Sequence, residues 1–203
     1  CAVEYAQIRY LLESKGKIKE LEQIRKIAKL ANFVYIRQSG EYYGNAVPVL
    51  AARTVVGKEP FAVLWGDEFI MADPPRLAQM IEVYKKYGGA VISAVQLEKE
   101  EQFSRYGIAR IEPVENNVFK IKEIVEKPGA EKAPSKFATH GAYILPPEIF
   151  DIISDLKPGR NGEIWLVDAI NKLIGSGFPV YGSVIKNARY YDTGNKLEYL
   201  KTV

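Results

Sequence analysis

Cysteine and histidine are almost absent from this sequence of 203 residues, which contains one of each, Cys1 and His140. A single cysteine excludes an internal disulfide and a zinc site built from several cysteines. It also favours a reducing compartment such as the cytoplasm. His140 is therefore the only candidate for a histidine base, and we interpret it as a strand residue.

The sequence also lacks a strong net charge and a long apolar run. There are 28 Lys and Arg residues against 25 Asp and Glu residues, a net charge of +3. This near balance gives no electrostatic reason to expect nucleic acid or a membrane as a partner. No apolar run approaches the roughly 20 residues of a membrane span. With 47% hydrophobic and 26% charged residues, the composition suits a globular protein with one good-sized core.

Strand-like and helix-like segments alternate along the first part of the chain. The expected helices are residues 4–32, broken near Gly16, a segment from Asn45 to about Val56, and residues 74–88. The expected strands are residues 33–38, 61–65 and 89–97. This alternation predicts a parallel sheet with helices on its faces.

Short alternating segments in the second part predict antiparallel pairing as well. Residues 106–114 and 118–127 have the pattern of a β-hairpin, and residues 178–185 and 189–192 that of a second, late hairpin. The remaining expected elements are a strand at 137–145 and helices at 146–156, 162–177 and 193–203. We expect one α/β domain over residues 1–203, Rossmann-like, with a mixed but mostly parallel sheet, helices on both faces and inserted β-hairpins.

Two aspartates stand where short apolar strands end, Asp67 in "FAVLWGDEFI" and Asp192 in "RYYDTGN". Ligands of open α/β sheets bind beyond the carboxyl ends of strands, so the two can converge. Paired carboxylates suit Mg²⁺, which prefers oxygen ligands and shares itself with substrate phosphates. A turn or helix-cap role remains open, because Asp before Thr-Gly is a common turn sequence.

Glu126 and Lys127 end a predicted strand immediately before a Pro-Gly break. A glutamate can accept hydrogen bonds from sugar hydroxyls, and a neighbouring lysine can act as a point charge on a phosphate. A solvated strand end is the alternative, and the two residues alone do not decide between them.

Taken together, four blocks resemble the sugar-1-phosphate nucleotidyltransferases, and in particular the bacterial-type UTP–glucose-1-phosphate uridylyltransferases. The blocks are residues 37–47, 61–70, 125–145, and 161–170 with 190–200. The resemblance implies a nucleotide-diphospho-sugar transferase fold, Mg²⁺ as cofactor, UTP and glucose 1-phosphate as substrates, and a possible homo-oligomer. It implies direct attack of the sugar phosphate on the α-phosphorus of UTP, giving UDP-glucose and pyrophosphate, without a covalent protein nucleophile.

Eight residues match functional positions of that family. The substrate-binding matches are Gln38 and Gly44 near the uracil base, Gly107 and Gly141 along the sugar, Glu126 on glucose hydroxyls and Lys127 on the sugar phosphate. The metal matches are Asp67 and Asp192, which with Lys127 would be the catalytic residues. Glu163 also lies in a matching motif, where contact with substrate and capping of a helix both remain open.

One departure from the family concerns its glycine-rich loop of the G-x-G-T-R type, which cradles the nucleotide phosphates. No such motif occurs in these 203 residues. We therefore expect that an N-terminal portion of the domain is missing and that this chain alone has little or no uridylyltransferase activity. A non-catalytic nucleotide-sugar binding module, a partner subunit, and a related thymidylyl- or guanylyltransferase remain the alternatives.

Overall fold

The structure, a computed structural model, describes residues 2–193, 196 and 199–200 and divides into two compact units, Cys1–Arg37 and Gln38–Val203. The single domain expected over residues 1–203 is therefore described as two units, each by itself. None of the described helices combines the length and the apolar character that crossing a membrane requires.

The first unit is a helical pair formed by α1 (Ala2–Ser14) and α2 (Ile18–Ala28). The break expected near Gly16 is confirmed: this glycine has a φ of +64°, a left-handed conformation that glycine adopts without steric cost. The strand expected over residues 33–38 is wrong, because no regular structure is assigned there and no described strand pairs with it. Alternating apolar residues form a strand only where a partner satisfies the backbone.

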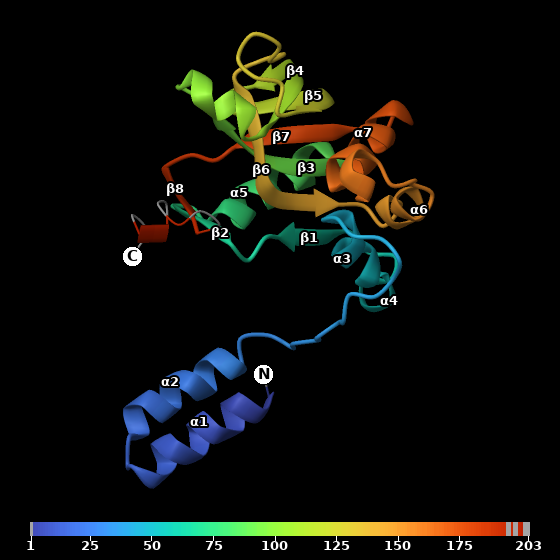
Figure 1. The fold of residues 1–203 in the computed structure, drawn as a ribbon. Coiled ribbons are helices and arrows are strands. Elements are labelled where there is room, and N and C mark those ends of the chain that lie inside the picture. Colours follow the sequence, from blue (N-terminus) through green and yellow to red (C-terminus); the bar gives the residue numbers. More distant parts are fainter. Residues whose placement is uncertain (1, 194–195, 197–198, 201–203) are drawn as a thin grey trace. The chain divides into compact units, whose positions relative to one another are not determined.

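The larger unit holds short helices, a six-stranded sheet and a separate two-stranded ribbon (Figure 1). Its helices are α3 (Ala46–Ala51), α4 (Arg53–Val56), α5 (Arg76–Tyr87), α6 (Ile149–Ser154), α7 (Leu166–Gly175) and the 3₁₀ segments η1 (Glu100–Ser104) and η2 (Arg160–Gly162). Its strands are β1 (Phe61–Leu64), β2 (Glu68–Ala72), β3 (Ala90–Gln96), β4 (Gly107–Glu115), β5 (Val118–Glu126), β6 (Phe137–Leu145), β7 (Val180–Val184) and β8 (Ala188–Asp192).

The main sheet has the strand order β1-β6-β3-β7-β5-β4, with β4 also pairing with β6. The expected mixed α/β class is confirmed, but the share of parallel strands differs from the expectation. Among the described strands only β3 and β7 pair in parallel, and the other pairs of this sheet are antiparallel. The predicted hairpin is formed by β4 and β5, whose short connection permits only antiparallel pairing.

Helices cover both faces of this sheet, as the sequence predicts (Figure 1). On one face α3, α6 and α7 bury an apolar cluster with Ile92 of β3, while on the other α5 buries Met80 and Val83 against Val91. Successive residues of β3 therefore face opposite clusters, which follows from the two-residue period of a strand. Buried on both faces, β3 has an apolar sequence that only Ser93 interrupts before Gln96.

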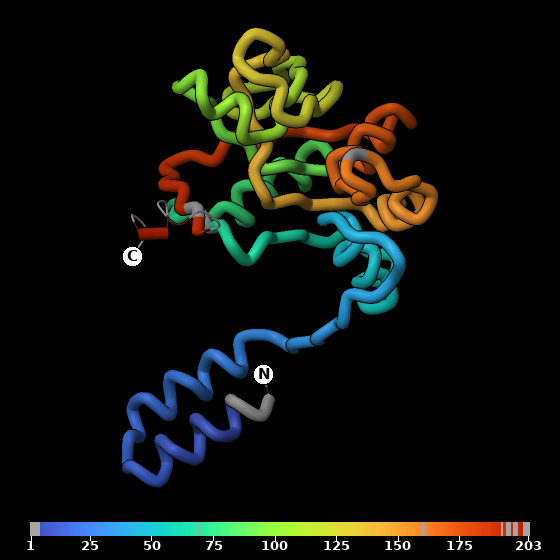
Figure 2. The backbone as a smooth tube through the Cα atoms, viewed as in Figure 1, coloured from blue at the N-terminus to red at the C-terminus, as the bar shows by residue number. Residues whose placement is uncertain are grey.

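The ribbon of β2 and β8 was not anticipated. The late hairpin expected within residues 178–192 is wrong, because β7 joins the main sheet and β8 pairs antiparallel with β2. Figure 2 shows the C-terminal part of the chain returning to lie beside this early segment. The helix expected over residues 193–203 falls largely outside the described residues.

Candidate functional site

A cavity of about 200 Å³ opens where β5 ends and β4 begins. It brings together Gly107, Glu126, Lys127 and Gly141, four of the residues selected from the sequence. They come from three strands and the turn after β5, so their proximity is created by the sheet. The further lining residues are Asn45, Trp65, Glu68, Arg105, Tyr106, Ile124, Thr139, His140, Tyr143, Trp165, Val167 and Ile170.

Gly107 of β4 and Glu126 of β5 are strand partners, and both line the cavity. A Cβ on Gly107 would stand 3.0 Å from Oε2 of Glu126, so a larger residue would crowd that carboxylate. Lys127 leaves the strand with a φ of +49°, which is uncommon for a residue with a side chain. Its N–H donates to the carbonyl of Tyr106 at 3.1 Å, and its Nζ lies 3.7 Å from Glu126 Oε1. An acceptor and a cation thus stand at one edge of the cavity.

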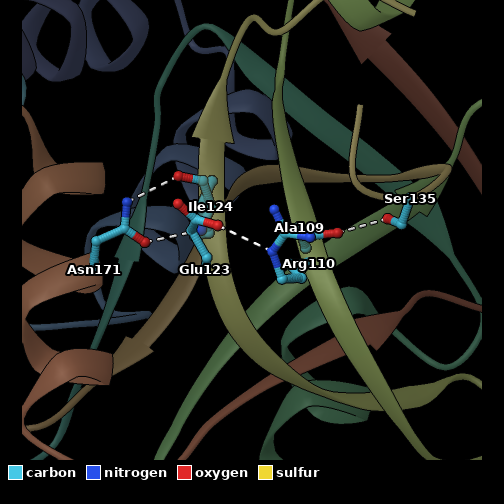
Figure 3. A network of polar contacts seen from close by, with 6 residues as sticks. All are labelled: Ala109, Arg110, Glu123, Ile124, Ser135 and Asn171. Carbon is cyan, nitrogen blue, oxygen red and sulfur yellow. Dashed lines mark hydrogen bonds and ion pairs between the residues drawn. The ribbon is translucent and has the colours of Figure 1, made fainter. Parts of the chain in front are cut away.

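Helix α7 is fastened to β5 close to this edge. The side chain of Asn171 bonds both backbone groups of Ile124: its Oδ1 accepts from the N–H and its Nδ2 donates to the carbonyl, each at 2.8 Å (Figure 3). On the same strand Glu123 pairs with Arg110 of β4 at 3.1 Å. The two bonds of Asn171 fix β5 close to its end, where Glu126 and Lys127 follow, whereas the pair of Glu123 and Arg110 is exposed to solvent.

Gly141 also lines the cavity, at a point where β6 passes too close to its neighbours for any side chain. A Cβ there would lie 1.9 Å from Oε1 of Glu68 and 2.1 Å from Cδ1 of Trp65. The backbone carbonyl of Gly141 also accepts from the N–H of Trp65 at 3.2 Å. Only glycine permits this close approach, so the position predicted for the sugar wall is a packing requirement as well.

Asp67 and Asp192 are brought side by side by the β2–β8 ribbon. Asp67 is exposed in the turn between β1 and β2, and the next residue, Glu68, is the Cα partner of Asp192. Thr193 follows Asp192, and both its N–H and its hydroxyl donate to the carbonyl of Asp67, at 2.8 and 2.6 Å. The side chain of Asp192 lies outside the described part of the structure. Two adjacent carboxylate residues are a donor set that suits a hard cation such as Mg²⁺.

The described residues hold no group of three or more His, Cys, Asp or Glu side chains placed to bind a metal.

The segment matched to uracil binding is only partly placed at the cavity. Gly44 packs against the backbone of Ile164, where a Cβ would stand 2.2 Å from the carbonyl oxygen. Its neighbour Asn45 lines the cavity, and the side-chain oxygen of Asn45 accepts from the N–H of Leu166 at 2.7 Å. Asn45 therefore satisfies the first turn of α7, and not the helix that follows it in sequence as expected. Gln38 is exposed in a loop and does not line this cavity.

Two polar aromatic side chains, His140 and Tyr143, also line the cavity. His140 is 4% exposed, and neither of its ring nitrogens hydrogen-bonds to a described residue. Burial, with the nearby charge of Arg76, lowers the pKa of His140 to about 4. Burial raises the pKa of Tyr143 to about 12. Near pH 7 the imidazole is unprotonated but only a weak base, because its pKa is low, and the phenol of Tyr143 keeps its proton. The interpretation of His140 as a strand residue agrees with its place in β6.

The cavity contains one more feature that the sequence did not signal. Trp65 and Trp165 are the two tryptophans of the chain, and both line the cavity. Trp165 also lines a neighbouring cavity of about 390 Å³ together with Glu126 and Lys127. Aromatic faces of this kind offer apolar surface to a sugar or a base.

Comparison with known proteins gives relatives over nearly the whole chain. A UTP–glucose-1-phosphate uridylyltransferase of Bacillus subtilis is 37% identical over 196 residues, which is 97% of this chain and 65% of the relative. A UTP–glucose-1-phosphate uridylyltransferase of Staphylococcus haemolyticus is 41% identical over 198 residues, 97% of this chain and 67% of the relative. This chain thus spans about two thirds of the length of these curated relatives.

Solved structures agree with the sequence relatives. A UDP-glucose pyrophosphorylase complexed with UDP-glucose has a TM-score of 0.83 at 35% identity, covering 92% of this chain and 70% of that one. A UTP-bound UGPase from Acinetobacter baumannii has a TM-score of 0.82 at 30% identity, covering 96% and 67%. The family model described as nucleotidyl transferase matches residues 3–203. The resemblance expected from the four sequence blocks is confirmed, and the chain belongs to the nucleotidyl transferase family.

Proposed function

We propose that this chain carries the sugar side of a uridylyltransferase site that makes UDP-glucose and pyrophosphate from UTP and glucose 1-phosphate. The observation that carries the proposal is the cavity that gathers Gly107, Glu126, Lys127 and Gly141 beside the turn of Asp67. It is supported by the names of relatives at 37% and 41% identity and by related structures described with UDP-glucose and UTP.

In this proposal the protein positions charges and supplies no covalent nucleophile. A phosphate oxygen of glucose 1-phosphate forms a bond to the α-phosphorus of UTP, and the bond to the bridging oxygen breaks with its electron pair leaving on pyrophosphate. Glu126 accepts hydrogen bonds from glucose hydroxyls, and the ammonium of Lys127 faces the sugar phosphate. Such catalysis rests on orientation and on stabilisation of phosphate charge.

The same proposal assigns a divalent cation, Mg²⁺, to Asp67 and Asp192. When bound, Mg²⁺ would neutralise phosphate charge and orient the phosphate groups. The donor chemistry of the two carboxylate residues fits this ion, as described above. We also propose that the reaction takes place in the cytoplasm, which the single cysteine favours, and that the protein forms a homo-oligomer.

The test is a titration of the 203-residue chain with UDP-glucose, followed by tryptophan fluorescence. Because Trp65 and Trp165 both line the cavity, a ligand there should change the emission in a saturable way. Glu126→Ala should weaken binding about tenfold or more, since the charged acceptor proposed for the glucose hydroxyls is lost. Glu123→Ala, on the same strand but paired with Arg110, is the matched control and should bind normally. Absence of saturable binding, or equal effects of both substitutions, would contradict the proposal.

A second candidate function is binding of the nucleotide sugar without turnover. The observation that favours it is the lack of a glycine-rich phosphate loop anywhere in the 203 residues. We expect the chain alone to bind UDP-glucose but to form little of it from UTP and glucose 1-phosphate, as measured by pyrophosphate release. Full turnover by the chain alone would refute the second candidate. Competition among UTP, dTTP and GTP would separate a uridylyltransferase from a thymidylyl- or guanylyltransferase.

A further inference from the structure

The ribbon of β2 and β8, which carries both candidate metal ligands, is not a strand pair of the main sheet. A two-stranded ribbon is marginally stable in water, so its position must come from side chains that attach it to the rest of the protein. Ile70 and Ala72 of β2 pack against the apolar cluster under α5. Glu68 stands on the same face by the two-residue period of the strand, at the end nearest the aspartates. A charged residue therefore takes the inward position at the functional end of the ribbon.

Four elements meet at the carboxylate of Glu68. Tyr190 of β8 donates its hydroxyl to Oε2 at 2.7 Å, and a guanidinium nitrogen of Arg76, on the first turn of α5, lies 3.7 Å from Oε1. The backbone of Gly141 in β6 leaves the space that the carboxylate fills, as the 1.9 Å approach shows. His140 Nδ1 lies 3.9 Å from Oε2. The side chain of Glu68 consequently joins β2 to β8, α5 and β6.

The attachment is buried, which makes its geometry demanding. The side chains of Glu68 and Arg76 are 13% and 9% exposed. A buried carboxylate needs an opposite charge and hydrogen bonds, and removal of one partner leaves the other charge uncompensated. Because burial lowers the pKa of His140 to about 4, the imidazole is neutral, and Arg76 is the cation that balances Glu68. The ion pair is therefore a specific support for the ribbon.

We propose that Glu68 is a positioning residue that holds Asp67 and Asp192 in place for metal binding. Glu68 directly follows Asp67 in the chain and is the Cα partner of Asp192 in the ribbon. The inference rests on the proposed function, since it assumes that these two aspartates bind the cation. Residues that orient metal ligands typically change metal affinity by about 10- to 100-fold when substituted.

The test measures Mn²⁺ binding, by electron paramagnetic resonance, to the full chain in the presence of UDP-glucose. Glu68→Gln keeps the shape of the side chain and removes its charge, and should weaken Mn²⁺ binding by about 10- to 100-fold. Asp67→Ala should abolish binding. Glu82→Gln, an exposed glutamate of α5 paired with Lys85, is the matched control and should leave Mn²⁺ binding unchanged.

A second variant keeps the test decisive if Glu68→Gln does not fold. Tyr190→Phe removes one hydrogen bond to Glu68 and should weaken Mn²⁺ binding by about threefold to tenfold, with an unchanged circular dichroism spectrum. Wild-type Mn²⁺ affinity in either folded variant would overturn the positioning role. Absence of Mn²⁺ binding by the wild-type chain, with UDP-glucose still bound, would instead refute the proposed metal site and this inference with it.

Discussion

Acid should destabilise the larger unit through a single side chain, the buried imidazole of His140. It is 4% exposed, packed between the rings of Tyr106 and Tyr190 at centroid distances of 4.7 and 4.4 Å. Its pKa falls from an ordinary value of 6.5 to about 4 in the folded protein. Between these two values the unfolded chain binds a proton that the folded chain rejects. The contribution of His140 to the free energy of unfolding is therefore fully present above about pH 6.5 and is lost as the pH is lowered toward 4.

The size of the effect follows from the two pKa values. Each pH unit of separation is worth about 1.4 kcal/mol, so the free energy of unfolding should fall by about 2 kcal/mol near pH 5 and by about 3 kcal/mol near pH 4, relative to pH 8. Carboxylates add their own dependence at the acid end. A variant without the imidazole, His140→Phe, retains that contribution and lacks only the part due to histidine.

The assay compares urea unfolding of wild type and His140→Phe between about pH 8 and pH 4.5, followed by tryptophan fluorescence. Both tryptophans lie in the unit Gln38–Val203, so the signal reports the unfolding of that unit. The free-energy difference between the two proteins should shift toward the variant as the pH falls. Because the chain has one histidine, its imidazole resonances can be assigned without ambiguity and titrated directly by NMR.

Either of two results would refute this reasoning about His140. An imidazole that titrates near 6.5 in the folded protein would show that the ring reaches water or gains a partner when charged. A stability difference between wild type and His140→Phe that stays constant from about pH 8 to pH 4.5 would show that protonation of the ring costs nothing.

Three further predictions concern the cavity. Gly141→Ala would place a Cβ 1.9 Å from a carboxylate oxygen, so it should lower the free energy of unfolding in urea by about 1–3 kcal/mol and weaken UDP-glucose binding. Gly175→Ala is the control: because the space around Gly175 is open, this variant should be neutral or slightly stabilising. Asn171→Leu should lower the free energy of unfolding in urea by about 2 kcal/mol or more, because the N–H and the carbonyl of Ile124 both lose their partner. An unchanged unfolding midpoint would contradict a stabilising role for these two bonds. Lys127→Ala should weaken glucose 1-phosphate binding more than UTP binding in calorimetry, and the reverse order would misplace the sugar phosphate.

Local patterns in the sequence were sufficient for most elements. The hairpin of β4 and β5 and the helix α5 between its proline and glycine were predicted because their signals lie within a few adjacent residues. The motifs around Glu126 and Gly141 selected residues that line one cavity. Chemical type and the following Pro-Gly break pointed to Glu126 and Lys127 without deciding their role, and the family resemblance selected Gly107 and Gly141.

Long-range pairing decided the rest. The segments β7 and β8 are neighbours in sequence and look like a hairpin, yet β8 pairs with β2, more than a hundred residues earlier. Asn45 looks like the cap of its own helix and instead bonds the first turn of α7. Such choices depend on which faces become buried together, and the periodicity of one segment does not contain that information.

The sequence by itself thus determined the mixed α/β class and the family resemblance, because these rest on residue type and local spacing. Only the tertiary structure placed Asp67 beside Asp192 and put a buried ion pair, Glu68 with Arg76, behind them. In the sequence Glu68 is only a second carboxylate directly after Asp67. Only the structure shows that this side chain is largely buried, with Arg76 of α5 as its opposite charge and the hydroxyl of Tyr190 in β8 as a hydrogen-bond donor.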